Sequence, residues 1–140
     1  MSFLESIQAG INKATQADIN VQQVNNLLIN ITNEIQTISK KDIRLVKAIS
    51  TLASIKKAAA SFEDPATPKE FFDSDQLCLT LEKTAVPVAK WRQNKEGFPC
   101  ILTFDGAEFI CDDASELTAA LKLLLSTANF GKTLKEMMDS

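Results

Sequence analysis

Apolar side chains recur at helical spacing through the first forty residues. Phe3, Leu4, Ile7, Ile11 and Ala14 predict a short amphipathic helix. A second apolar series then steps by four and three residues: Ala17, Val21, Val24, Leu28, Ile31, Ile35 and Ile38. This seam lasts for three heptads, which is about 30 Å of helix. It fits a coiled coil between copies or two helices packed within one domain, and we favour packing within the domain.

The apolar spacing predicts a second helix after a short break at 39–42. Asp42 is its predicted N-cap. Ile43, Val46, Ile49 and Ala53 continue on one face. The short connection favours an antiparallel helical hairpin over residues 1–60. Residues 61–73 contain two prolines and read as a linker, because proline bars the continuation of a helix.

From residue 74 onward the period changes to two, which is typical of strands. Leu77, Leu79 and Leu81 alternate with polar or small residues, and 88–94, 98–104 and 107–111 are further strand candidates. Asp113 and Glu116 stand at capping-box spacing before a last apolar stripe. The sequence therefore predicts an α+β fold: an N-terminal helical hairpin, then a four-stranded antiparallel meander with a C-terminal helix over residues 74–140.

The stretch CILTFDGAEFIC gives the most explicit local prediction. Asp105-Gly106 between alternating apolar residues predicts a two-residue hairpin turn. The register then pairs Cys100 with Cys111 on the core face of the sheet. Because free cysteine behaves as a small hydrophobe, we interpret both as buried thiols rather than as a disulfide.

Composition narrows the possible chemistry. The 140 residues include no histidine and no tyrosine, so the usual catalytic triads and histidine metal ligands are excluded. Three cysteines form no CxxC motif, which suits a reducing, cytoplasmic location. No phosphate-binding glycine motif and no bilayer-length apolar run is present. We expect no cofactor, no metal and no membrane association, and an enzyme would have to use carboxylates or a thiol.

Charge differs between the two parts of the chain. Residues 1–60 carry seven basic and four acidic residues, whereas residues 61–140 carry eight basic and fourteen acidic ones. The basic residues from Lys40 to Lys57 could form a stripe that contacts nucleic acid. No aromatic residue is interleaved and the sequence pI is about 5.0, so we take nucleic-acid binding as the alternative and not as the leading hypothesis.

An amide-rich helix face suggests a protein interface. Asn26, Asn30 and Asn33 replace the charged residues that solvent-facing helices usually carry, and neutral amides are easier to desolvate. The leading hypothesis is a non-enzymatic adaptor, chaperone or immunity-type binder that forms homo-oligomers through its N-terminal helices. The expected interaction residues are Val21, Val24, Leu28, Ile31, Ile35, Asn26, Asn30, Asn33 and Trp91. Trp91 fits a buried position as well as an exposed one.

Overall fold

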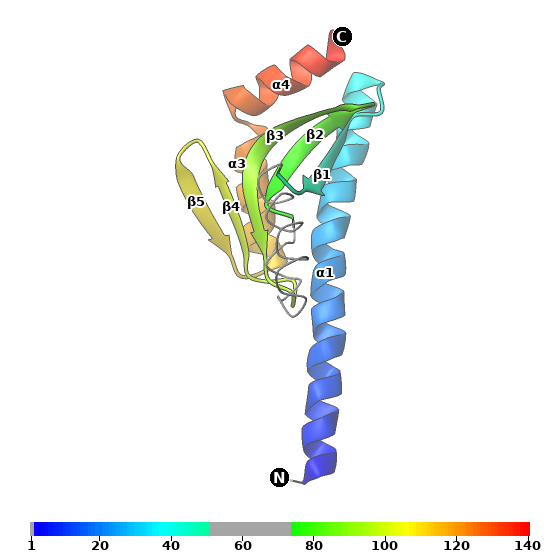
Figure 1. The fold of residues 1–140 in the computed structure, drawn as a ribbon, viewed down its shortest axis with the longest axis vertical. Helices are drawn as coiled ribbons and strands as arrows, with labels where there is room; N and C mark the ends of the chain where they lie inside the picture. Colours follow the sequence, from blue (N-terminus) through cyan, green and yellow to red (C-terminus); the bar gives the residue numbers. More distant parts are fainter. Residues whose placement is uncertain (1, 51–73) are drawn as a thin grey trace, which may run out of the picture.

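The computed structural model describes residues 2–50 and 74–140 and has an α+β fold (Figure 1). The elements are α1 (Phe3–Ser39), β1 (Arg44–Ala48), β2 (Gln76–Leu81), β3 (Thr84–Gln93), β4 (Cys100–Phe104), β5 (Ala107–Cys111), α3 (Ala114–Leu125) and α4 (Ala128–Met138). The described strands form one five-stranded antiparallel sheet in the order β1-β2-β3-β4-β5. Each strand therefore pairs with its neighbours among the described strands, as in a meander.

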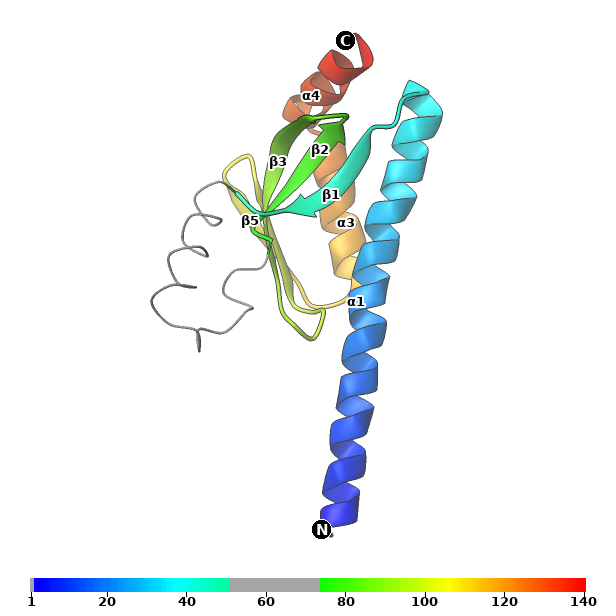
Figure 2. The same cartoon turned by 45° about the vertical axis from the view of Figure 1, so that its right-hand side comes forward.

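One face of the sheet packs against helices. Figures 1 and 2 show α1 beside β1 and α3 between the sheet and α1, where α3 packs against β4 and β5. Helix α4 lies at one end of the molecule against β2, β3 and α3. Buried leucines from the sheet and the helices dominate the core between these layers. Hydrophobic burial of this kind is the main force that holds the layers together.

The predicted second helix is wrong where the structure describes it. Residues 44–48 form strand β1, in which Leu45 lies opposite Leu79 of β2. Ile43 and Leu45 are both buried and two residues apart, which is strand spacing. The fold therefore has one N-terminal helix followed by five described strands, in place of a helical hairpin and four strands. The remaining part of the predicted helix, 51–60, and the predicted linker, 61–73, lie outside the described residues.

The two N-terminal helical patterns belong to a single helix. Ser2 caps its start, since the Ser2 side chain accepts from the amide of Glu5 at 3.2 Å. Its end is set at Lys40, which adopts a left-handed conformation with φ of 57°. Asp42 follows this end, and the structure places it as a side-chain partner of Gln36 and Arg44 rather than as an N-cap.

The predicted hairpin around Asp105-Gly106 is confirmed. Both turn residues have positive φ, 50° and 77°, as a type I′ turn requires. Cys100 lies opposite Cys111, and both are buried. The predicted cap of α3 is also confirmed, because the Asp113 side chain accepts from the Glu116 amide at 2.8 Å.

Candidate functional site

Helix α1 has two halves with different surroundings. The half that follows Asn20 lies on the body of the protein, and its residues Val24, Leu28 and Ile35 are buried in the core. Every residue from 3 to 16 is exposed. Figure 1 shows this exposed half running beyond the sheet toward the N-terminus. We call residues 3–16 the arm and residues 20–39 the docked segment.

The loop between β3 and β4 marks the start of the docked segment. The side-chain amide of Asn20 donates to the carbonyl of Glu96 at 3.2 Å. Gly97 has φ of 96°, and a Cβ added there would lie 2.4 Å from the Asn20 Cβ. Only glycine allows this close approach of the loop to the helix. The arm therefore begins to project where the last loop contact ends.

The arm carries an exposed apolar stripe. Phe3 is 90% exposed, Leu4 77%, Ile7 61% and Ile11 54%. Leu4, Ile7 and Ile11 are three and four residues apart, so they lie on one helix face. Isolated exposed apolar residues are ordinary, whereas a contiguous apolar row is typical of an interaction surface.

Local contacts stabilise the arm as a helix. Gln8 donates its side-chain amide to Asn12 at 3.1 Å, and Gln16 donates to Asn20 at 2.9 Å, both across one helical turn. An isolated helix of the arm's length is marginal in water. Because the docked segment already supplies a formed helix, the arm only has to propagate it.

A groove lies between the docked segment and β1. Its volume is about 600 Å³. The residues that line it are Asn25, Leu28, Ile29, Thr32, Asn33, Gln36, Arg44, Leu45, Val46 and Lys47. Ile29 is 55% exposed although it stands beside this groove. The groove therefore offers an apolar floor with a polar and cationic rim.

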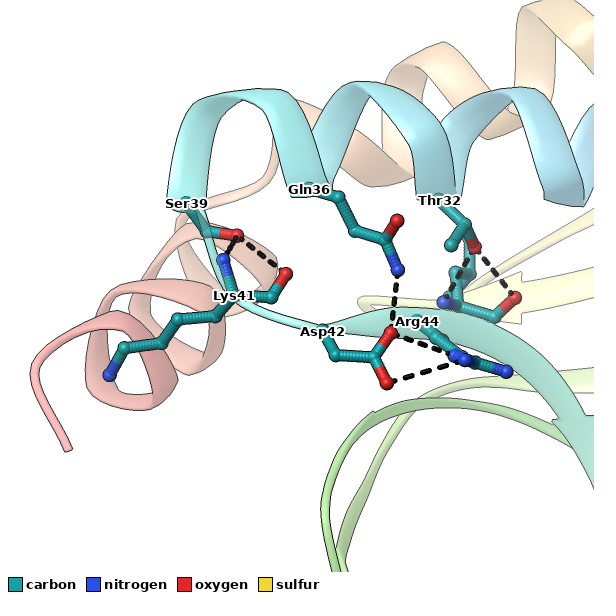
Figure 3. Close-up of polar contacts among 7 residues, drawn as sticks. Thr32, Gln36, Ser39, Lys41, Asp42 and Arg44 are labelled. Carbon is teal, nitrogen blue, oxygen red and sulfur yellow. Dashed lines mark hydrogen bonds and ion pairs between the residues drawn. The ribbon is translucent and has the colours of Figure 1, made fainter.

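Hydrogen bonds fix the geometry of the groove (Figure 3). The Thr32 hydroxyl accepts from the Leu45 amide at 3.0 Å and donates to the Leu45 carbonyl at 3.4 Å. Gln36 donates to Asp42 at 2.8 Å, and Asp42 pairs with Arg44 at 3.0 Å. Because these contacts join α1 directly to β1, the walls of the groove are held at a fixed spacing.

The sequence-predicted interaction residues fall into three groups. Val24, Leu28 and Ile35 are buried, and Val21 and Ile31 are half-buried, so the heptad seam packs within the chain. The amide residues Asn26, Asn30 and Asn33 are exposed on the docked segment. Trp91 is 3% exposed and belongs to the core. The sequence left two alternatives for the seam, a coiled coil between copies and packing within one domain. The structure shows packing within the chain.

The surface that sequence reasoning missed is the stripe of the arm. Its apolar residues were recognised as one side of an amphipathic helix, but not as uncovered. The sequence contained one signal, the separation of this stripe from the seam at Ala14 and Ala17, where the spacing departs from the regular pattern. This change of phase rotates the stripe of the arm away from the face that packs on the sheet.

The described basic residues do not form a helical stripe. Lys41 donates to the carbonyls of Met137 and Ser140 at the end of α4, at 3.2 and 2.5 Å. Lys47 donates to Asn25 at 2.9 Å and to Gln93 at 3.2 Å. Lys40 ends α1, while Lys56 and Lys57 lie outside the described residues. The geometry that motivated the nucleic-acid alternative is therefore absent from residues 40–50.

The three cysteines are buried free thiols. Burial, together with the neighbouring Cys111, raises the pKa of Cys100 to about 12. Burial also raises the pKa of Cys78 and of Cys111. High pKa values and burial make poor nucleophiles. Within residues 2–50 and 74–140, no three acidic or cysteine side chains gather as metal ligands would.

Comparison with family models, with curated proteins and with solved structures found no match for this chain. Among the described helices, none combines the length and the apolar character that crossing a bilayer requires. The arm and the groove together form the candidate functional site.

Proposed function

We propose that the protein is a non-enzymatic assembly protein that self-associates through helix α1, with the arm as the interface. The carrying observation is the row of exposed apolar side chains at Phe3, Leu4, Ile7 and Ile11 on a helix that projects from the folded body. Full burial of a large apolar side chain contributes about 1.5–3 kcal/mol, so covering this row is a substantial driving force.

The polar side of the arm favours a protein surface over a lipid surface. Helices that lie on anionic membranes are rich in lysine and arginine on their polar face. The arm has one such residue, Lys13, against one acid, Glu5, and its remaining polar positions are mainly amides and hydroxyls. Electrostatic attraction to anionic lipid would therefore be weak, whereas a neutral amide flank is easily desolvated against protein.

Light scattering at tens of micromolar protein tests this proposal. The wild-type chain should show a mass of at least twice 15.4 kDa. Changing Leu4, Ile7 and Ile11 together to serine should give the monomer mass, because the apolar row is lost. Circular dichroism should show that the sheet and the core remain folded.

A matched control uses exposed apolar residues outside the arm. Ile38 is 70% exposed and Leu123 is 51% exposed. Changing both to serine removes apolar surface of similar chemistry and should leave the mass of the assembly unchanged. A wild-type chain that is monomeric at these concentrations would contradict the proposal.

A further inference from the structure

We infer that two copies pair antiparallel along α1, with the arm of each copy lying in the α1–β1 groove of the other. This inference rests on the proposed self-association and specifies its geometry. It names a second copy of this chain as the occupant of the groove.

The first support is that the stripe of the arm and the groove share one side of α1. Residues 4, 7, 11, 15, 18, 22, 25, 29, 33 and 36 follow one another in steps of three or four, with a mean close to the 3.6-residue turn. The early members are the apolar residues of the arm, and 25, 29, 33 and 36 line the groove. A straight helix thus presents both surfaces in the same direction.

The second support is the position of the two surfaces along this face. Ile7 and Ile29 are 22 residues apart in sequence, about 33 Å along a helix. An antiparallel partner centred near Asp18 brings Ile7 of one copy to Ile29 of the other, and the reverse contact forms by symmetry. Such a pair is closed, because each surface is used once and no further copy can add.

The third support is charge. Both charged side chains of the arm lie off the stripe, since Glu5 is nearly opposite Ile7 and Lys13 is nine residues after Leu4. The stripe that would enter the groove is therefore uncharged. The two cations that line the groove already have partners within the chain, because Arg44 pairs with Asp42 and Lys47 donates to Asn25 and Gln93. A parallel arrangement would place groove beside groove, and like charges would face each other.

Disulfide trapping distinguishes the two arrangements. The chain with both Ile7→Cys and Ile29→Cys should form a covalent dimer under mild oxidation, whereas either single variant alone should not. The two new thiols cannot bridge within one chain, because about 33 Å of helix separates them. The native cysteines are buried and should give no background.

A control variant tests the helix face. Ile38 is exposed on α1 but lies off the face that lines the groove, so Ile7→Cys with Ile38→Cys should not form the covalent dimer. A covalent dimer from Ile7→Cys alone would place the two arms against each other, which would overturn this inference while leaving self-association intact. A dimer by light scattering that no double variant traps would also overturn it. A monomer by light scattering would overturn both proposals.

Discussion

The arm and the docked segment are two halves of one helix with opposite roles. Both halves carry large apolar side chains at helical spacing. In the docked segment Val24, Leu28 and Ile35 are at most 5% exposed, whereas in the arm Leu4 and Ile7 remain 77% and 61% exposed. Amphipathic spacing thus predicts a helix with one apolar face. Whether that face is buried within the same chain depends on the elements that pack beside it.

The largest expected effect comes from truncating matched residues in the two halves. Leu28→Ala should lower the free energy of unfolding by about 2–5 kcal/mol, because it removes a buried side chain and leaves a cavity. Ile7→Ala should change the free energy of unfolding of the monomer by about 0.5 kcal/mol or less, since no core contact is lost.

Urea denaturation at low protein concentration measures both variants. Light scattering at higher protein concentration should then show the opposite ranking for self-association, with Ile7→Ala weakening it more than Leu28→Ala does. Equal loss of stability in the two variants would mean that the arm is also docked, and the contrast between the halves would fail.

The next largest effect should come from the loop that marks the boundary between the halves. Gly97→Ala places a Cβ 2.4 Å from the Asn20 Cβ and also strains a backbone with φ of 96°. Overpacking of this kind costs about 1–3 kcal/mol. Urea denaturation of the variant should show this loss.

Gly131→Ala supplies the control for the loop variant. Gly131 lies within α4, and no described atom other than its own helix backbone and chain neighbours comes within 4 Å of an added Cβ. Alanine there should stabilise the helix by about 0.5–1 kcal/mol. A neutral Gly97→Ala would show that the loop does not hold α1 in place.

A third prediction concerns the thiol that lies beside this loop. Cys100 donates from its Sγ to the Gly97 carbonyl at 3.1 Å. Its pKa is raised from 9.0 to about 12 in the folded state. Below pH 9 the thiol is neutral in both states and its contribution to stability is complete. Between pH 9 and 12 the unfolded chain ionises first, so stability should fall as pH rises.

The expected slope for this single group is at most about 1.4 kcal/mol per pH unit. Thermal or urea denaturation from pH 8 to 11 measures it, and Cys100→Ala should show a shallower decline. An identical pH dependence in the two proteins would rule out the assigned role of Cys100.

The smallest effect should come from the middle of the proposed pairing face. Asp18 of each copy would lie near the two-fold axis, where two carboxylates repel weakly across solvent. Asp18→Asn should therefore tighten self-association by about 0.2–1 kcal/mol at low salt. Sedimentation of the wild type and the variant at low and high salt should show a difference that shrinks as salt rises. Tightening that is the same at all salt concentrations would contradict an electrostatic origin.

The β4–β5 hairpin and strand β1 show what the sequence could and could not predict. The hairpin was predicted to the correct register because its turn chemistry and alternating pattern are local. Strand β1 was missed because Ile43, Leu45 and Val46 fit a helix face as well as a strand. Its strand conformation depends on pairing with β2, which is far away in sequence.

The candidate site was harder to predict than the fold. Spacing identified the apolar residues of the arm, but spacing alone cannot show which of them the body covers. The seam residue Leu28 and the arm residue Ile11 both belong to apolar runs spaced by three and four residues. The phase change at Ala14 and Ala17 separates the two runs, but it does not show which run the body covers. The groove could not be predicted from the sequence either. Strand β1 forms one of its walls, and the sequence pattern predicts a helix at that position.

The hydrogen bonds of Thr32 have a further consequence for solubility. β1 lies at the edge of the described sheet. On that edge the Thr32 hydroxyl forms hydrogen bonds with both the amide and the carbonyl of Leu45. Unpaired strand edges are templates on which other chains can add and aggregate. The docked segment therefore covers part of this edge and should hinder the addition of other chains there. A change that loosens α1 should cause precipitation before the sheet itself unfolds.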